Sequence, residues 1–281
     1  MLRLWLTGFL LLPVYLAFGG ETNVVWVSRS WQSSDGLPDN NVVGVAQTPD
    51  GYLWVATAGG LMRFDGARFQ EFPLANIEGV PNRVVKAMIC DRRGWLWLGM
   101  DRGPIVCIAP AETRVYTNVP DAYATFIADD ADGSVWITYT DGGLTRIKKG
   151  QVTVFDSSSG WPASGPSALA TDINGELWFA RGNQLGVFRD EKFQTLITLR
   201  NTISCIGQRR EGGVWVYAHH QLLEFSEGSQ PRVYGEFPGT AGRALQPQAI
   251  LEDKNDSVWV GTAANGLFHF SGTNADLVSS S

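Results

Sequence analysis

The sequence predicts an all-β protein, a β-propeller of four-stranded blades of which six are visible, and two observations support this fold. Tryptophan recurs at intervals of 43, 39, 42, 37 and 44 residues. A period of roughly 40 to 45 residues made of short strands is typical of propeller blades, because one blade must stack on a neighbour to bury its faces. The repeat tryptophans are Trp54, Trp97, Trp136, Trp178, Trp215 and Trp259. Glycine is abundant, charged residues make up 18% of the chain, and no long amphipathic helix pattern follows residue 20.

Two turn signals precede each repeat tryptophan. Three residues before it, five repeats have glycine and the last has aspartate, which favours a tight turn with a positive φ angle. These residues are Gly51, Gly94, Gly133, Gly175, Gly212 and Asp256. Six residues before it, four repeats have aspartate, whose carboxylate is expected to accept hydrogen bonds from the amides of the turn. These residues are Asp91, Asp130, Asp172 and Asp253, with Thr48 and Arg209 in the two other repeats.

The strands follow from these turns in order. In the first blade we expect strands at 42–47, 52–57, 61–65 and 68–72. In the last blade we expect only three strands, at 248–252, 258–262 and 267–270. An isolated strand at 24–31 precedes the first blade, so we expect it to supply the missing outer strand of the last blade and to close the ring. An incomplete seven-bladed ring is the alternative.

The first twenty residues have the pattern of an export signal. Arg3 precedes an apolar run over 5–18 that ends near small residues. We expect residues 1–20 to be a signal peptide or an N-terminal anchor and residues 21–281 to form the propeller domain, in the periplasm or outside the cell. Removal of residues 1–20 changes the net charge from −6 to −7, because Arg3 is the one charged residue lost. A mildly acidic exported domain is a poor candidate for binding nucleic acid.

Three segments around the first repeat tryptophan carry a family resemblance. They are WQSSDGLPDNNV at 31–42, TPDGYLWVAT at 48–57 and GLMRFDG at 60–66. This pattern resembles the two component regulator propeller repeat, and parts of it recur in the second, fourth and sixth repeats. The resemblance implies an extracytoplasmic sensor joined through a membrane-spanning helix to a histidine kinase or another output module. No kinase motif is visible after Phe270. We therefore expect a ligand-sensing chain that is not itself an enzyme, with a membrane sensor kinase or a second copy as partner.

Candidate ligand-binding residues follow from the geometry of a propeller. The segments that lead into each innermost strand and the loops that follow each tryptophan strand emerge on one face and surround the central channel. Arginine, amide, tyrosine and carboxylate groups there would suit a glycan or a small anionic ligand. The main candidates are Arg83, Asp101, Arg102, Tyr139, Asp141, Arg181, Asn183, His219, His220 and Arg243. The same loops also present Asn40, Asn41, Asn82, Tyr123 and Asn265.

No catalytic residue, cofactor or metal ion is predicted. His219 and His220 are adjacent and would point to opposite faces of a strand end, an arrangement that rarely binds one ion. The aspartate-rich turns at 130–133 and 253–256 lack the downstream glutamate of a calcium loop. Turn formation therefore explains both segments without an ion.

Cys90, Cys107 and Cys205 form an odd set without metal-like spacing. We expect them to be small buried residues, and a disulfide between Cys90 and Cys107 within one blade is the alternative.

Two further functions stay open at this point. The first is an exported propeller enzyme similar to the streptogramin lyases, whose blades also carry an Asp, Gly and Trp repeat. The second is a scaffold that binds another protein through its rim, and exposure of Trp161 would support it.

Overall fold

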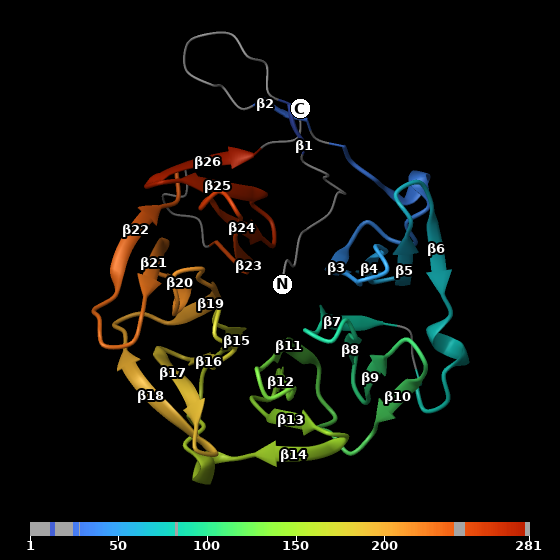
Figure 1. Cartoon of the computed structure of the whole chain (residues 1–281), viewed down its shortest axis with the longest axis horizontal. Helices are drawn as coiled ribbons and strands as arrows, with labels where there is room; N and C mark the ends of the chain where they lie inside the picture. Colours follow the sequence, from blue (N-terminus) through green and yellow to red (C-terminus); the bar gives the residue numbers. More distant parts are fainter. Residues whose placement is uncertain (1–11, 15–24, 28, 82–83, 239–244, 279–281) are drawn as a thin grey trace.

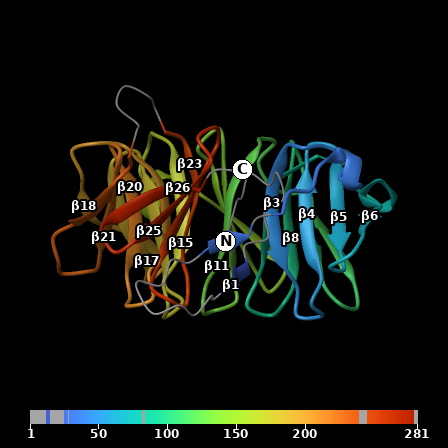
Figure 2. The same cartoon turned by 90° about the horizontal axis from the view of Figure 1, so that it is seen from above.

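The computed structural model describes residues 12–14, 25–27, 29–81, 84–238 and 245–278. Six four-stranded antiparallel sheets surround a central channel, which confirms the predicted all-β propeller with six blades (Figure 1). Turned by 90°, the molecule is a thick disc whose innermost strands run along the channel (Figure 2). Among the described residues, no helix is long and apolar enough to cross a membrane.

The four strands of each blade follow one another in the chain from the channel outward. Blade 1 consists of β3 (Val42–Gln47), β4 (Leu53–Thr57), β5 (Gly60–Phe64) and β6 (Phe69–Phe72). Blade 2 consists of β7 (Val85–Cys90), β8 (Leu96–Met100), β9 (Ile105–Ile108) and β10 (Thr113–Tyr116). Blade 3 consists of β11 (Ala124–Asp129), β12 (Val135–Tyr139), β13 (Leu144–Lys148) and β14 (Gln151–Phe155). Blade 4 consists of β15 (Ser167–Thr171), β16 (Leu177–Arg181), β17 (Gln184–Arg189) and β18 (Lys192–Thr198). Blade 5 consists of β19 (Ile203–Gln208), β20 (Val214–Ala218), β21 (Gln221–Phe225) and β22 (Arg232–Glu236). Blade 6 consists of β23 (Pro247–Glu252), β24 (Val258–Thr262), β25 (Leu267–Ser271) and β26 (Asn274–Val278).

Short elements lie outside the blades. Strands β1 (Leu12–Val14) and β2 (Val25–Val27) form a separate antiparallel pair. Single 3₁₀ turns occur at Ser33–Asp35, Leu74–Asn76 and Ser157–Ser159. Apart from strand β1, the predicted export signal at residues 1–20 lies outside the described residues.

The turn between the first and second strands has the predicted left-handed residue in every blade. The φ angle lies between +60° and +92° at Gly51, Gly94, Gly133, Gly175, Gly212 and Asp256. Glycine adopts this conformation without steric cost, and aspartate is one of the few other residues that tolerate it.

The aspartate six residues before the tryptophan holds this turn, as predicted, in blades 2, 3, 4 and 6, and in blades 2, 3 and 6 it also binds the indole. In blade 3, Asp130 Oδ1 accepts the Ser134 amide at 2.9 Å and Asp130 Oδ2 accepts Trp136 Nε1 at 2.7 Å. Asp91 and Asp253 make the same two kinds of contact in blades 2 and 6. One carboxylate therefore satisfies the backbone of the turn and the only polar atom of the buried indole.

Each repeat tryptophan of blades 1 to 5 packs against the blade that follows. In one buried cluster, Trp97 and Ile89 of blade 2 meet Ile127 and Val135 of blade 3. Clusters built from the same repeat positions join blade 1 to 2, 3 to 4, 4 to 5 and 5 to 6. The core is thus divided among the junctions between blades, where apolar burial stabilises the ring.

The last blade is completed by its own outer strand. β26 pairs with β25 over its whole length, and β2 pairs with β1 in a separate sheet. The predicted closure of the ring by an N-terminal strand at 24–31 is therefore wrong. The outer strand was missed because it is short and open to water: Asn274 and Asp276 interrupt its apolar residues, and its largest apolar residue, Leu277, is 51% exposed.

The three cysteines are free. In the register of blade 2, Cys107 lies opposite Trp97 and Cys90 lies opposite Leu96. Because Leu96 and Trp97 are successive residues of β8, the two cysteines lie on opposite faces of the blade, and the alternative of a disulfide is wrong. Cys107 and Cys205 are buried, as expected for small core residues, whereas Cys90 is half-buried.

Candidate functional site

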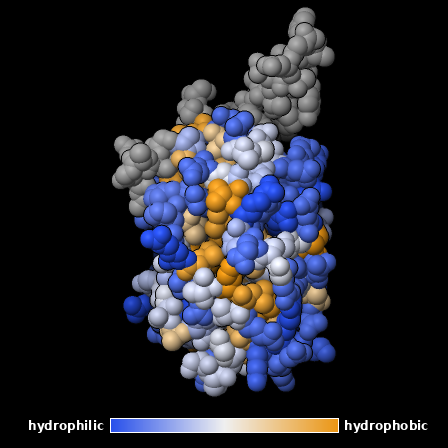
Figure 3. Space-filling model, turned by 90° about the vertical axis from the view of Figure 1, so that its left-hand side faces the viewer, coloured by the Kyte–Doolittle hydropathy of each residue, from blue (hydrophilic) through white to orange (hydrophobic). Residues whose placement is uncertain are grey.

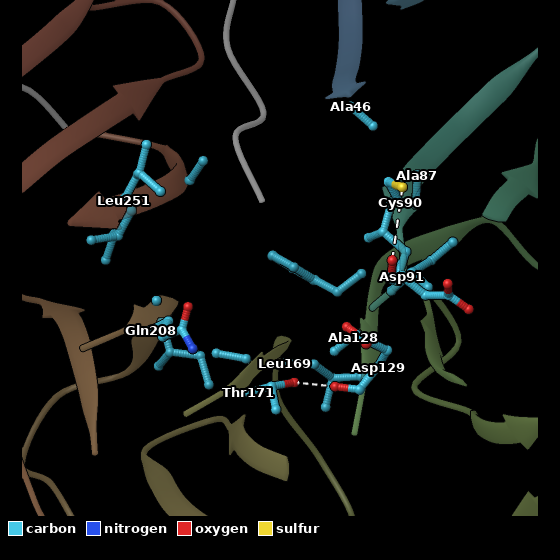
Figure 4. A pocket seen from close by; sticks show the side chains of 18 of the residues that line it. Ala46, Ala87, Cys90, Asp91, Ala128, Asp129, Leu169, Thr171, Gln208 and Leu251 are labelled. Atoms are coloured by element: carbon cyan, nitrogen blue, oxygen red, sulfur yellow. Dashed lines mark hydrogen bonds between the residues drawn. The ribbon is translucent and has the colours of Figure 1, made fainter. Parts of the chain in front are cut away.

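A cavity of about 510 Å³ occupies the channel toward one face of the disc. All six blades line it, through the second half of each innermost strand and the start of the turn that follows (Figure 4). We call this side of the disc the Asp-turn face, because it carries the turns between first and second strands. The volume is in the range of small-molecule binding sites.

One repeat position supplies a ring of side chains to this cavity. It is the last residue of each innermost strand, seven positions before the repeat tryptophan. We call these residues the channel ring: Gln47, Cys90, Asp129, Thr171, Gln208 and Glu252. The ring contains amide, carboxyl, hydroxyl and thiol groups, so its chemistry differs from blade to blade although its backbone position does not.

Between blades 2 and 3 the channel ring is linked to an arginine. Asp129 Oδ2 accepts the backbone N–H of Arg92 at 3.0 Å, and Thr171 Oγ1 donates to the carbonyl of Asp129. Burial raises the pKa of the Asp129 carboxyl above its ordinary value. The Arg92 guanidinium reaches the carbonyl of Asp172 in blade 4 at 3.5 Å. A half-buried carboxyl and a cation therefore stand side by side at this part of the cavity.

The same arrangement recurs between blades 5 and 6. Glu252 Oε2 accepts the backbone N–H of Arg210 at 2.8 Å, and Arg210 Nη1 donates to the carbonyl of Asp253 at 2.9 Å. Arg210 and Arg92 occupy one repeat position, five residues before the tryptophan, and both line the cavity. Two cations on separate blades thus contribute to the cavity at the Asp-turn face.

Gln208 is the channel-ring residue whose side chain is most available to a ligand. It is exposed, and within the described part of the chain its amide makes no hydrogen bond. The side chain projects from β19 into the channel (Figure 4). Apolar side chains form the adjoining wall, among them Ala46, Ala128, Leu169 and Leu251. The cavity therefore combines a polar ring with an apolar wall.

The predicted ligand-binding residues that the structure describes lie toward the opposite face, and none of them lines this cavity. Several belong to the framework of the blades. Tyr139 is 1% exposed and Arg181 is 5% exposed, with Arg181 Nε donating to the carbonyl of Pro162 at 2.9 Å. Asn183 Nδ2 donates to the carbonyl of Leu199 at 2.8 Å. These side chains hold loops in place.

Other candidates of that face occupy turns. Asp141 Oδ1 accepts the Gly143 amide at 2.8 Å. Asp101 and Arg102 follow β8, and the guanidinium carbon of Arg102 lies 5.6 Å from the ring centre of Tyr123, which is 39% exposed. Arg102 and Tyr123 are thus two candidates that the structure brings together on the exposed part of this face.

The two histidines form the turn between β20 and β21. Their φ angles are +50° at His219 and +64° at His220, and their ring centroids are 5.8 Å apart. In the part of the chain that the structure describes, no group of three or more His, Cys, Asp or Glu residues could hold a metal ion. Asn82, Arg83 and Arg243 lie outside the described residues.

None of the channel-ring residues is among the predicted ligand-binding residues, although the sequence contains a pattern that could have revealed them. Positions that build the blade repeat the same residue, such as glycine three before the tryptophan. The position seven residues before the tryptophan ends a mostly apolar strand, is polar in most repeats and differs between most of them. The channel ring is therefore a candidate site, although Asp129, Thr171 and Glu252 also hydrogen-bond to groups of neighbouring blades.

Comparison with known proteins finds one matching family model and several solved structures with a similar fold. Residues 36–59 match the family model of the two component regulator propeller. The matched segment contains the turn of Thr48 and Gly51 and the first repeat tryptophan, Trp54, so it confirms the resemblance predicted from the sequence. A search of curated proteins finds no match.

Solved structures share the fold across most of this chain. Streptogramin B lyase superposes with a TM-score of 0.71 at 17% identity, covering 97% of this chain and 88% of the lyase. The extracellular domain of the hybrid two component system BT4673 from B. thetaiotaomicron gives 0.68 at 17% identity, covering 86% of this chain and 33% of that domain. The corresponding domain of BT3049 from the same organism gives 0.65 at 21% identity, covering 82% and 32%. This chain therefore spans about a third of the length of those two domains, and likeness at these identities shows the fold alone.

Proposed function

We propose that this chain is an extracytoplasmic sensor propeller that binds a hydroxyl-rich ligand, such as a glycan, in the channel cavity. The observation that carries the proposal is the channel ring, which places the Gln208 amide, the Asp129 carboxyl and the Thr171 hydroxyl around one cavity of about 510 Å³. Amides and carboxyls bind the hydroxyl groups of sugars, and the apolar wall would contact the hydrocarbon face of a sugar ring. Arg92 and Arg210 would favour a ligand that also carries a carboxylate.

Calorimetric titration with short neutral and uronic-acid-containing oligosaccharides tests this site. We expect Gln208→Ala to weaken binding roughly tenfold, because loss of one hydrogen bond of about 1.4 kcal/mol changes the dissociation constant by that factor. Gln194→Ala is the matched control, since Gln194 lies exposed on the outer strand β18. We expect it to bind as the wild type does.

The same titration distinguishes the two faces of the disc. Arg102→Ala alters the face that the sequence predicted, and we expect it to leave binding unchanged. If Arg102→Ala weakens binding while Gln208→Ala does not, the ligand binds the opposite face. If no oligosaccharide binds at all, the glycan proposal is wrong.

An enzymatic alternative is tested with the same protein. The fold is shared with virginiamycin B lyase from Staphylococcus aureus, of which a catalytically inactive variant was solved with quinupristin. We expect quinupristin incubated with this protein to keep its chromatographic retention. A new product that depends on the protein would assign a lyase activity instead.

Export is part of the proposal. Arg3 and the apolar run over 5–18 have the composition of an export signal, and the similar sensor domains are extracellular. Alkaline phosphatase fused after residue 281 should be active in bacteria that carry the full chain. Deletion of residues 1–20 should abolish that activity, and an active fusion without them would contradict export by this segment.

A further inference from the structure

A second repeat position of the innermost strands interrupts the regular pairing of the blades. In blades 1, 2, 3, 5 and 6 the register between the first and second strands shifts by one residue, which is a β-bulge. The extra residue stands eleven positions before the repeat tryptophan in each of these blades. Blade 4 differs, because its first strand pairs with the second without a shift. We call the extra residues the bulge ring: Val43, Lys86, Thr125, Ser204 and Gln248.

The bulge keeps its residue open to solvent between buried neighbours. In blade 5, Ser204 is exposed, whereas Ile203 and Cys205 on either side are each 1% exposed. A residue of a regular strand points to one of the two faces of its sheet, and both faces of blade 5 are covered by neighbouring blades. A bulge turns its extra residue away from that alternation. Ser204 therefore escapes burial and stays at the channel edge of the blade.

The bulge ring borders the same cavity as the channel ring, toward the opposite face of the disc. Each bulge-ring residue precedes the channel-ring residue of its own strand by four positions. In blade 6, all five residues from Gln248 to Glu252 line the cavity. The cavity therefore extends along β23 for roughly 13 Å, since a strand rises about 3.3 Å per residue. This length exceeds that of a single sugar ring.

Blades 5 and 6 carry polar side chains that are available at both ends of this cavity. Ser204 is exposed and Gln248 is half-buried, and within the described residues neither side chain makes a hydrogen bond. They stand at equivalent positions of β19 and β23, two innermost strands that contact each other. Gln208, whose amide is also available, lies four residues after Ser204 on β19 and projects into the channel (Figure 4). One wall of the channel thus offers hydroxyl and amide groups along its length.

The bulge-ring residues of blades 2 and 3 contact the protein itself. Thr125 Oγ1 lies 2.8 Å from Thr138 Oγ1, within hydrogen-bond distance. Lys86 Nζ lies 5.5 Å from the ring centre of Tyr123. Val43, in blade 1, has no polar atom in its side chain. The side chains most available to a ligand at this end of the channel are therefore those of blades 5 and 6.

We propose that Ser204 and Gln248 form a second subsite of the channel and that the ligand is a linear chain of at least two sugar units. One unit would bind at the channel ring, where Gln208 lies, and the next would bind the Ser204 hydroxyl and the Gln248 amide. Hydroxyl and amide groups can each donate and accept hydrogen bonds, as sugar hydroxyls require. This inference rests on the proposed function, because both subsites belong to the cavity assigned there to a hydroxyl-rich ligand.

Titration with sugars of increasing length tests the second subsite. The probes are cello-oligosaccharides and oligogalacturonides of one, two and four units, measured by calorimetry. We expect Ser204→Ala and Gln248→Ala each to weaken binding of the four-unit chains roughly tenfold and to leave binding of the single unit unchanged. Gln208→Ala should weaken binding at every length. Gln194→Ala, on the outer strand β18, is the matched control and should bind as the wild type does.

Three results would overturn this inference. If Ser204→Ala and Gln248→Ala bind the four-unit chains as the wild type does while Gln208→Ala does not, the ligand is confined to the channel ring, and only the second subsite is wrong. If the same two variants weaken the single unit and the four-unit chain by one factor, both rings form a single compact site. If no probe of any length binds, the proposed function is wrong together with this inference.

Gln248→Glu supplies an independent readout. This variant keeps the size of the side chain and adds a negative charge at the second subsite. We expect it to weaken binding of the four-unit oligogalacturonide more than that of the four-unit cello-oligosaccharide, because like charges repel. Thermal melts should show that the variant is as stable as the wild type, since Gln248 makes no hydrogen bond within the described residues. Wild-type binding of both chains by Gln248→Glu would show that the ligand does not reach Gln248.

Discussion

The indole Nε1 of Trp215 donates a hydrogen bond to Glu252 Oε2 at 2.8 Å, across the junction between blades 5 and 6. In blades 2, 3 and 6 the acceptor is the aspartate of the same turn. Blade 5 has Arg209 at that position, so the neighbouring blade supplies the acceptor instead. Glu252 also accepts the amide of Arg210 and lines the channel cavity. One carboxylate therefore connects two blades, a repeat tryptophan and the candidate site.

Glu252 should contribute measurably to stability. Glu252→Ala leaves the partly buried Trp215 Nε1 and the Arg210 amide without their acceptor, so we expect the free energy of unfolding to fall by about 1–3 kcal/mol. Glu252→Gln keeps an acceptor oxygen and should cost less. Urea denaturation measures both, with Glu78→Ala at an exposed position as control. Equal stability of Glu252→Ala and Glu78→Ala would disprove the role of this contact.

Trp136 should be among the most sensitive positions of the chain. Its side chain is fully buried, and its ring centroid lies 4.5 Å from that of Phe188 and 5.8 Å from that of Phe193. We expect Trp136→Ala to lower the free energy of unfolding by about 3–5 kcal/mol, because the large cavity left between blades 3 and 4 cannot close. Val154→Ala, at a residue that is 57% exposed, is the control. A thermal melt of Trp136→Ala that matches the wild type would refute this packing.

The two aspartates Asp129 and Asp65 should respond to pH with opposite signs. Burial raises the pKa of the Asp129 carboxyl above 3.8, because the buried group resists ionisation. The stability that the folded protein has while this carboxyl is protonated is fully present below pH 3.8 and is lost as the pH rises through the raised pKa. Asp129→Asn should therefore gain stability relative to the wild type as the pH rises from about 3 to 7. Thermal melts across this range measure the difference.

Asp65 provides the matched comparison. Backbone hydrogen bonds from Arg68 and Ala67 hold the pKa of Asp65 below 3.8, so its stabilising contribution is present above that value and is lost as the pH falls. Asp65→Asn should lose stability relative to the wild type as the pH rises. If both variants shift in the same direction, burial is not what controls Asp129.

The native thiols should react slowly. Burial raises the pKa of Cys90 to about 11 and that of Cys107 to about 12. At pH 8 only about one molecule in a thousand would carry a Cys90 thiolate, which is the reactive form. We expect slow reaction with a thiol reagent in the native protein and rapid reaction of all three cysteines in guanidinium. A native thiol that reacts as fast as free cysteine would contradict this, and Cys90→Ser would identify whether it is Cys90.

Trp161 does not provide the exposed side chain that would support the protein-binding scaffold left open by the sequence. Trp161 is 5% exposed, its ring centroid lies 5.0 Å from that of Phe193, and its Nε1 donates to the carbonyl of Gly142 at 3.1 Å. The side of the molecule that carries β18 and β22 is largely hydrophilic with separate apolar areas (Figure 3). Trp161 is therefore buried, whereas support for a scaffold required it to be exposed.

Local chemistry made the blades predictable. The innermost strand of blade 1 was predicted at 42–47 and is observed at Val42–Gln47. The turn glycines and the turn aspartates interact with residues at most six positions away. A single repeat therefore contains both the aspartate and the backbone amides and indole that it binds. The outer strand β26 was missed because a strand with one wet face has little apolar pattern to reveal it.

The position of the candidate site was not predictable in this way. Tyr139 and Arg181 looked like loop residues available to a ligand, yet neighbouring blades and loops bury them. Asp129 and Gln208 are 79 residues apart in the chain and line one cavity because the ring brings blades 3 and 5 to the same channel. Burial and proximity of this kind depend on how the blades are placed around the axis.

The sequence by itself determined the structure of the single blade. Its turns, its tryptophan strand and the hydrogen bonds of its turn aspartate depend on contacts between residues a few positions apart. The tertiary structure decided which side chains face the channel, which blade provides the acceptor for Trp215 and where Leu251 stays exposed. Those properties arise between blades, where partners are roughly one repeat period or more apart in the chain, and only the curvature of the ring brings them together.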